Sequence, residues 1–142
     1  MQKGILAVGL TMALSGCITS TTETGERDVI AAKSENLYAF QERKSENDAT
    51  IVVTRDSGAL GTGTAFGFYI DGKLAGKFYR QERAEFHVAS GRYILGYGIE
   101  SGLLKKGPRK EIETILSPGE KKYFRLSMDQ DSNMNISPVS AK

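Results

Sequence analysis

Cys17 is the only cysteine of this 142-residue chain, and it follows Leu14, Ser15 and Gly16. The small side chains of Ser15 and Gly16 leave the backbone before Cys17 open to a peptidase. A thiol becomes a nucleophile once it is deprotonated, and it can then accept a lipid group. A lone cysteine cannot form a disulfide within its own chain. These four residues therefore predict cleavage and modification rather than cross-linking.

The segment before Cys17 has the composition of a secretion signal. Lys3 supplies a positive charge, and the eleven residues 4–14 contain no charged side chain. As a helix they would rise about 16 Å, roughly half of a ~30 Å hydrocarbon core. We expect residues 1–16 to be a signal peptide. The alternatives are an ordinary cleaved signal with an incidental cysteine, and an N-terminal core helix.

The tetrapeptide Leu14-Ser15-Gly16-Cys17 resembles the bacterial lipobox, in which the cysteine becomes acylated. The resemblance implies a membrane anchor on Cys17. Three acyl chains would contribute on the order of 30 kcal/mol, because each buried methylene contributes ~0.8 kcal/mol. Ile18 stands where inner-membrane retention signals usually show aspartate. By resemblance, the destination is the outer membrane of a Gram-negative envelope, with the domain on its periplasmic side.

Few side chains offer catalytic or metal chemistry. His87 is the only histidine, and it lies between Phe86 and Val88 in a strand-like stretch that points it to the opposite face. With Cys17 taken by lipid, thiolate catalysis and thiolate metal sites are lost. We expect no catalytic residue, no metal and no cofactor. A hydrolase acting on envelope polymers, with His87 and a carboxylate such as Asp56 or Asp71, is the alternative.

Three other stretches could bind a ligand. The loop 103–110 combines two leucines with the cations Lys105, Lys106 and Arg109, which could contact an anionic membrane or polymer. Arg55 is a further candidate binding residue. The glycine-rich stretch 58–64 lacks the Lys-Ser/Thr ending of a phosphate loop, and residues 129–133 lack the glycine and glutamate of a calcium loop. We interpret both as turns or loops.

Residues 18–48 are predicted to be a tether. The first part is polar and rich in threonine, which favours disorder. Leu37 and Phe40 could lie on one face of a short helix that packs on the domain. The alternative is an unstructured linker up to Asp48. These residues and the lipidated Cys17 form the predicted segment 17–48.

From Ala49 onward the pattern changes to strands. β-Branched and alternating apolar residues with turn signals between them predict an antiparallel β-sandwich of seven to eight strands, of immunoglobulin or transthyretin type, over residues 49–140. Asp71-Gly72 predicts a tight hairpin turn, and Ser90-Gly91 predicts a further turn of the chain. The predicted strands are 49–55, 64–70, 73–79, 84–89, 92–100, 110–116, 121–128 and 134–140.

The alternating residues predict the core between two sheets. We expect it to contain Phe66, Phe68, Ile70, Phe78, Phe86, Val88, Leu95 and Tyr97. Four glycines, Gly67, Gly76, Gly96 and Gly98, fall inside predicted strands. A glycine there marks a bulge or a close approach to the backbone, and we expect bulges, with a bound ligand as the alternative.

The stretch FYIDGKLAGKF followed by AEFHVASGRYILG resembles a unit of the lipoprotein-rich Domain of Unknown Function 2846 family and of PEGA-type surface modules. The resemblance covers about residues 49–100, with a weaker extension to 128. Arg55 fits the family's arginine at the end of the first strand. The resemblance implies a periplasm-facing β-sandwich on a lipid anchor, with no established catalytic residues.

The balance of basic and acidic side chains indicates which class of partner the protein could bind. Without Lys3, 18 of the 19 basic side chains remain against 17 acidic ones, and no block of like charge could follow a phosphate backbone. We therefore expect no nucleic-acid partner. The sequence favours a non-enzymatic binding or assembly module with an envelope protein or polymer as partner. The hydrolase above and a structural lipoprotein of a secretion assembly remain the alternatives.

Overall fold

The computed structural model describes residues 28–58, 63–102 and 106–140, and it contains all eight predicted strands. The predicted signal peptide, Cys17 and Lys105 lie outside the described residues. The elements are β1 Ile30–Ala31, the 3₁₀ turn η2 Ser34–Asn36, β2 Ala49–Arg55, β3 Ala65–Ile70, β4 Lys73–Phe78, β5 Glu82–Val88, β6 Gly91–Ser101, β7 Lys110–Leu116, β8 Lys121–Met128 and β9 Met134–Val139.

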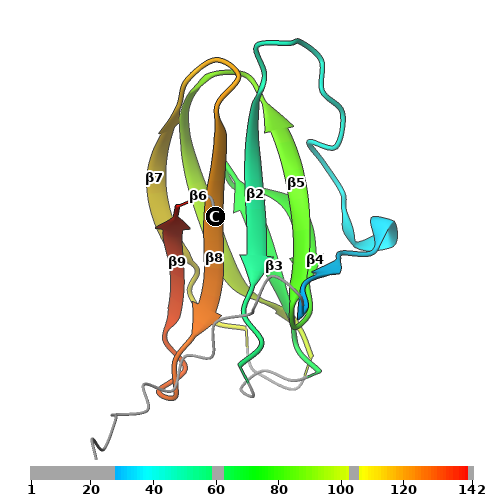
Figure 1. Cartoon of the computed structure of the whole chain (residues 1–142). Coiled ribbons are helices and arrows are strands. Elements are labelled where there is room, and N and C mark those ends of the chain that lie inside the picture. The colour runs from blue at the N-terminus through cyan, green and yellow to red at the C-terminus, as the bar shows by residue number, and fades with distance from the viewer. Residues whose placement is uncertain (1–27, 59–62, 103–105, 141–142) are drawn as a thin grey trace, which may run out of the picture.

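The strands form two facing sheets, which confirms the predicted β-sandwich (Figure 1). One sheet has the order β1-β5-β2-β8-β9 and the other the order β4-β3-β6-β7. Most neighbours are antiparallel, but β2 pairs with β8 and β1 pairs with β5 in parallel. The parallel pairs arise because the chain passes between the sheets after β2, β4, β5 and β7, so that a strand can return beside an earlier one in the same direction.

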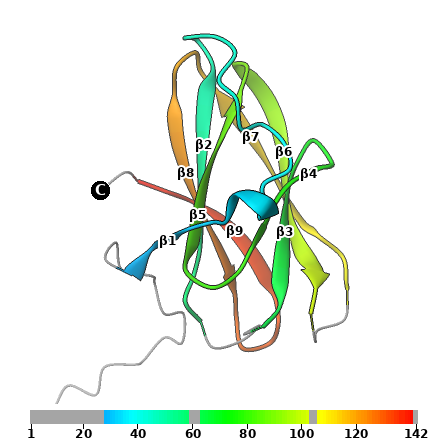
Figure 2. The same cartoon turned by 90° about the vertical axis from the view of Figure 1, so that its right-hand side faces the viewer.

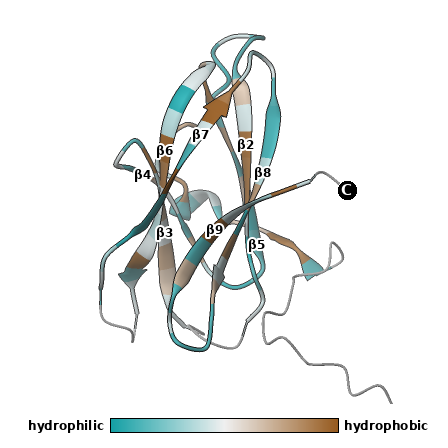
Figure 3. Cartoon of the chain, turned by 90° about the vertical axis from the view of Figure 1, so that its left-hand side faces the viewer, coloured by the Kyte–Doolittle hydropathy of each residue, from teal (hydrophilic) through white to brown (hydrophobic). Residues whose placement is uncertain are grey.

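The core lies between the sheets and contains all eight predicted residues, together with further apolar side chains such as Ile51, Phe124 and Leu126. Phe66, Phe68 and Phe86 are fully buried, and the rings of Phe68 and Phe86 lie 5.5 Å apart. Burial of such rings contributes most of the apolar area that stabilises a small domain. The outer faces are more polar, although the end of β7 is hydrophobic (Figure 3), where Ile115 is 59% exposed.

The segment before β2 contains the short 3₁₀ helix η2 and contacts both sheets, so the contacts of the sandwich begin before the predicted boundary at residue 49. Ile30 and Ala32 donate hydrogen bonds to the carbonyls of Gln81 and Arg83 beside β5. Leu37 then forms a bridge with Gly76 of β4. The segment thus crosses from one sheet to the other over the open side of the sandwich (Figure 2). It does so because its apolar side chains cover core residues that both sheets leave exposed there.

Both predicted turns are present. Asp71 and Gly72 have φ values of 46° and 77°, as a turn with two left-handed residues requires. Asp71 tolerates this conformation, and its carboxylate accepts a 2.8 Å hydrogen bond from the backbone N–H of Ile94. Ser90 and Gly91 lead from β5 to β6, which carries the chain between the sheets.

Candidate functional site

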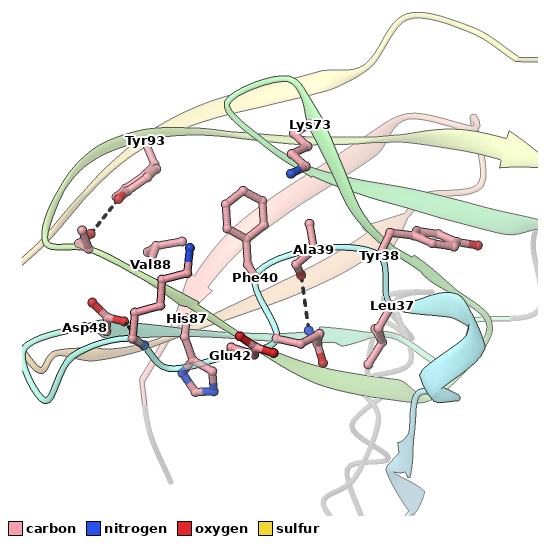
Figure 4. Close-up of a pocket in the computed structure, with 13 residues that line it drawn as sticks. Leu37, Tyr38, Ala39, Phe40, Glu42, Asp48, Lys73, His87, Val88 and Tyr93 are labelled. Atoms are coloured by element: carbon pink, nitrogen blue, oxygen red, sulfur yellow. Dashed lines mark hydrogen bonds between the residues drawn. The ribbon is translucent and has the colours of Figure 1, made fainter.

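An open cleft of about 720 Å³ lies on the side of the sandwich that the N-terminal segment crosses (Figure 4). This volume falls in the range of small-molecule sites. The cleft is formed by the segment before β2, the β3–β4 turn, the end of β5 and the start of β6. Its lining consists of Leu37, Tyr38, Ala39, Phe40, Gln41, Glu42, Lys44, Asp48, Lys73, His87, Val88, Ala89 and Tyr93.

Phe40 occupies the centre of the cleft in an unfavourable backbone conformation. Its φ is 61°, a left-handed value that costs a residue with a side chain roughly 1–2 kcal/mol. Its carbonyl accepts a 2.7 Å hydrogen bond from the backbone N–H of His87, which fixes the segment against β5. The ring points toward Lys73, whose Nζ lies 5.5 Å from the ring centroid (Figure 4). Such strain is typical of backbone that holds a side chain in a binding site.

Two polar groups of the lining are already engaged within the protein. The carboxylate of Asp48 accepts hydrogen bonds from the backbone N–H groups of Lys44 (2.8 Å) and Ser45 (3.2 Å), so it holds the turn before β2. The hydroxyl of Tyr93 donates to the carbonyl of Ala89 at 2.7 Å. Burial raises the pKa of Tyr93, and the carboxylates of Asp71 and Asp48 act in the same direction. Tyr93 therefore remains a neutral donor in the cleft wall.

His87 is held by a structural hydrogen bond on the outer face of its sheet. Its Nδ1 lies 3.2 Å from the hydroxyl of Thr50, and Arg43 donates to the same hydroxyl at 3.1 Å. Thr50 is 3% exposed. A threonine and a histidine at this distance could form a nucleophile and its base. The buried hydroxyl and the competing arginine instead favour a role in fixing the rim of the cleft.

Asp56, one carboxylate of the alternative hydrolase site, does not lie beside His87. Thr50 pairs with His87, and Asp56 lies six residues further along the same chain segment, about 20 Å away at the rise of a strand. Asp56 instead forms a 3.3 Å ion pair with Arg125. The predicted combination of His87 with Asp56 is therefore not assembled. Asp71 accepts a hydrogen bond from the backbone N–H of Ile94 through one carboxylate oxygen.

Arg55 lies in the interior rather than at a binding surface. It is 4% exposed, and its Nη1 donates 2.8 Å hydrogen bonds to the carbonyls of Thr64 and Phe78. Its guanidinium group also stacks on the ring of Phe66. The candidate binding role of Arg55 is thus replaced by a structural one.

Lys106 and Arg109, the two described cations of the predicted binding loop, lie beside the other sheet. Lys106 forms a 3.5 Å ion pair with Glu100, and the guanidinium of Arg109 lies 3.5 Å from the ring centroid of Tyr69. The turn at 129–133 is closed by its own residues, since Asp129 accepts hydrogen bonds from the backbone of Asp131 and Asn133. No cluster of three or more metal-ligating side chains occurs among the described residues.

The cleft itself was missed by the sequence analysis. Phe40, Lys73 and Tyr93 come from three separate segments, and no local spacing predicts that they converge. The spacing of the apolar residues 37 and 40 is the local signal for this region, and it predicts a helix face rather than a cleft. Within the described part of the chain, no helix has the length and apolarity needed to cross a bilayer.

Comparisons of the chain with protein-family models, with curated proteins and with solved structures found no match. The lipobox and the family resemblance stay predictions.

Proposed function

We propose that the protein is a lipid-anchored envelope lipoprotein whose β-sandwich binds a partner or ligand in the cleft around Phe40. The anchoring is supported by Leu14-Ser15-Gly16-Cys17 and the charged, short apolar segment before it. The binding role is supported by the cleft, which is the observation that carries it. Its volume, its aromatic lining and the strained Phe40 are the features expected of a preformed site.

Binding fits the lining better than catalysis does. Three polar side chains of the cleft wall, Gln41, Asp48 and Tyr93, form hydrogen bonds with the backbone. Groups held in this way give a rigid surface, and a rigid surface lowers the entropic cost of binding. A hydrolase would need a base aligned with a nucleophile, whereas His87 is aligned with the buried Thr50.

The position of the cleft suits a domain on a short anchor. Residues 18–27 link Cys17 to Asp28 and can span at most about 40 Å. The chain reaches the domain at Ile30, beside the start of β5, and Val88 at the cleft lies six residues further along that strand. Six residues of strand cover about 20 Å. The rim of the cleft therefore lies well away from the point where the anchor joins the domain.

The anchoring is tested by Cys17→Ser in the native host, with Ser15→Ala as the matched control. We expect the serine variant to lose its acyl groups by mass spectrometry and to leave the membrane fraction in its processed form or to accumulate as precursor. Ser15→Ala keeps a small residue before the cysteine, so it should remain acylated and membrane-bound. An acyl-free wild-type thiol would contradict the proposal.

The binding site is tested by site-specific photo-crosslinking in intact cells. Tyr38 lines the cleft and is 49% exposed, whereas Tyr79 is 41% exposed and lies outside it. Replacing each with p-benzoylphenylalanine puts the same probe at two similarly exposed positions. We expect a discrete adduct from position 38 and none from position 79. Adducts of equal yield from both positions, or from 79 alone, would place the contact elsewhere.

A further inference from the structure

Three glycines, Gly67, Gly96 and Gly98, leave a flat area without side chains on the outer face of the sheet β4-β3-β6-β7. Gly67, Gly96 and Gly98 point away from the core, and their missing side chains leave space that other residues of the same face fill. A Cβ on Gly67 would lie 2.8 Å from the ring of Tyr69, and one on Gly98 would lie 3.0 Å from Cγ of Arg109. Of the four strand glycines predicted to mark bulges, Gly76 lies beside the register shift between β3 and β4. Gly67, Gly96 and Gly98 instead allow Tyr69 and Arg109 to lie directly on the sheet.

Packing on this flat area and on the ring of Tyr69 holds Arg109 in one orientation. Its guanidinium lies 3.5 Å from the centroid of the Tyr69 ring, and Tyr69 is only 4% exposed although it is on an outer face. The hydroxyl of Tyr69 donates to the carboxylate of Glu100, which fixes the ring in turn. A stacked guanidinium keeps its N–H edge available for a two-pronged contact with a phosphate or carboxylate. Arg109 is exposed and forms no ion pair with any carboxylate of the described residues.

Two lysines flank the same group. Lys106 lies 3.5 Å from Glu100, and Lys77 pairs across the strands with Gly67, so it shares the outer face. Both lysines lower the pKa of Glu100, after the larger effect of its hydrogen bond from Tyr69. Glu111, opposite Gly96, is a second carboxylate on this part of the sheet. Three cations against two carboxylates leave a net positive charge, and both Glu100 oxygens lie beside donors.

We propose that this surface, formed by Tyr69, Lys77, Glu100, Lys106 and Arg109, binds the phosphate headgroups of anionic phospholipids. The choice of a membrane rests on the proposed anchor and on position. Ser101 at the end of β6 pairs with Ala65, at the same end of the sandwich as β1, where the chain leads back toward Cys17 (Figures 1 and 2). A surface at that end lies within reach of the bilayer, and its contact would orient the cleft away from the lipid.

The experiment uses the chain from residue 17 onward with Cys17→Ser, so that no acyl chain contributes to binding. All packing contacts described above fall within residues 28–140, so this chain retains the whole fold. Its affinity is measured for phosphatidylcholine vesicles with and without 30% phosphatidylglycerol, for wild type, Arg109→Gln, Arg109→Lys and Arg92→Gln. Arg92 is the matched control, since it lies on the same sheet at its other end and its side chain is 66% exposed.

We expect binding only to the anionic vesicles, weakened by salt. Arg109→Gln should lower the affinity about five-fold. Arg109→Lys should lower it as well, because lysine keeps the positive charge but lacks the planar guanidinium that stacks on Tyr69. Arg92→Gln should leave the affinity unchanged, and circular dichroism should show all variants folded. Equal binding to neutral vesicles, or an Arg109→Gln variant that binds like wild type, would overturn the proposal.

Inorganic phosphate separates a lipid from a soluble anion as the source of the contact. Phosphate is titrated against the same chain while the side-chain N–H signals of Arg109 are followed by NMR. We expect only weak, millimolar shifts. Saturation by free phosphate at concentrations where vesicles do not bind would assign the site to a soluble anion and contradict the membrane contact. Neither outcome depends on acylation of Cys17, so the test is separate from that of the anchor.

Discussion

Arg55 and Phe66 form a cation–π pair in the interior of the protein, with the guanidinium carbon 4.0 Å from the ring centroid. The same guanidinium donates to the carbonyls of Thr64, before β3, and Phe78, at the end of β4. Burial lowers the pKa of Arg55, while Tyr97 and Glu82 act in the opposite direction. One buried cation thus connects three strands at the end of the sandwich where β1 pairs with β5.

Arg55→Met tests this connection. Methionine fills most of the volume but removes both donors, and the loss of hydrogen bonds to buried carbonyls should lower the free energy of unfolding by about 2–4 kcal/mol. The measurement is urea denaturation followed by circular dichroism. Arg80→Met is the matched control, because Arg80 is exposed and donates only to the carbonyl of Ser57. We expect a loss below about 1 kcal/mol there. Equal losses for the two variants would refute the structural role of Arg55.

Phe68→Ala tests the predicted core. Phe68 is fully buried and lies against the rings of Phe78 and Phe86. Its truncation should lower the free energy of unfolding by about 3–5 kcal/mol, since the surrounding rings cannot close the cavity completely. Ile115→Ala removes an apolar side chain that is 59% exposed and should change stability by less than about 0.5 kcal/mol. A small effect at Phe68 in thermal or urea unfolding would contradict the facing-sheet core.

Gly72→Ala tests the hairpin between β3 and β4. Gly72 has a φ of 77°, so a Cβ there costs about 1–2 kcal/mol of backbone strain even though nothing lies within 4 Å of it. Gly107 also has open space around it but no left-handed φ. Gly107→Ala should therefore be neutral or slightly stabilising. If both alanine variants unfold at the same temperature, the left-handed backbone conformation is not the reason why position 72 requires glycine.

The strands could be predicted because each follows a local pattern. Alternating Phe66, Phe68 and Ile70 define one face of β3, and Asp71-Gly72 marks where it reverses. Local patterns do not determine which strands become neighbours. The parallel pairing of β2 with β8 brings together segments about 70 residues apart, and nothing in either stretch signals the direction of its partner.

The candidate site depends on longer-range contacts and was harder to predict. Leu37 and Phe40 lie in a segment without strand periodicity, and their positions are set by Gly76 and the backbone of His87. The predicted binding residues lie in different environments. Arg55 is buried, whereas Lys106 and Arg109 are at the surface. Burial of an arginine follows from its partners across the fold, which the linear sequence does not display.

The hydrogen bond from Tyr69 to Glu100 predicts a loss of stability at alkaline pH. Burial, and then this bond, raise the pKa of Tyr69 to about 12, from its ordinary value of 10.0. Between pH 10 and 12 the unfolded chain therefore loses this proton while the folded chain keeps it, so the stabilisation present below pH 10 is lost as the pH rises. Tyr69→Phe should show a shallower decline of the urea midpoint over this range. The phenolate absorbance near 295 nm should lose only the part of its late-titrating component that Tyr69 contributes, because burial also raises the pKa of Tyr97. Tyr38→Phe, at a tyrosine 49% exposed, is the control, and its decline should match that of wild type. The same decline in Tyr69→Phe as in wild type would show that the bond to Glu100 does not hold the proton on Tyr69.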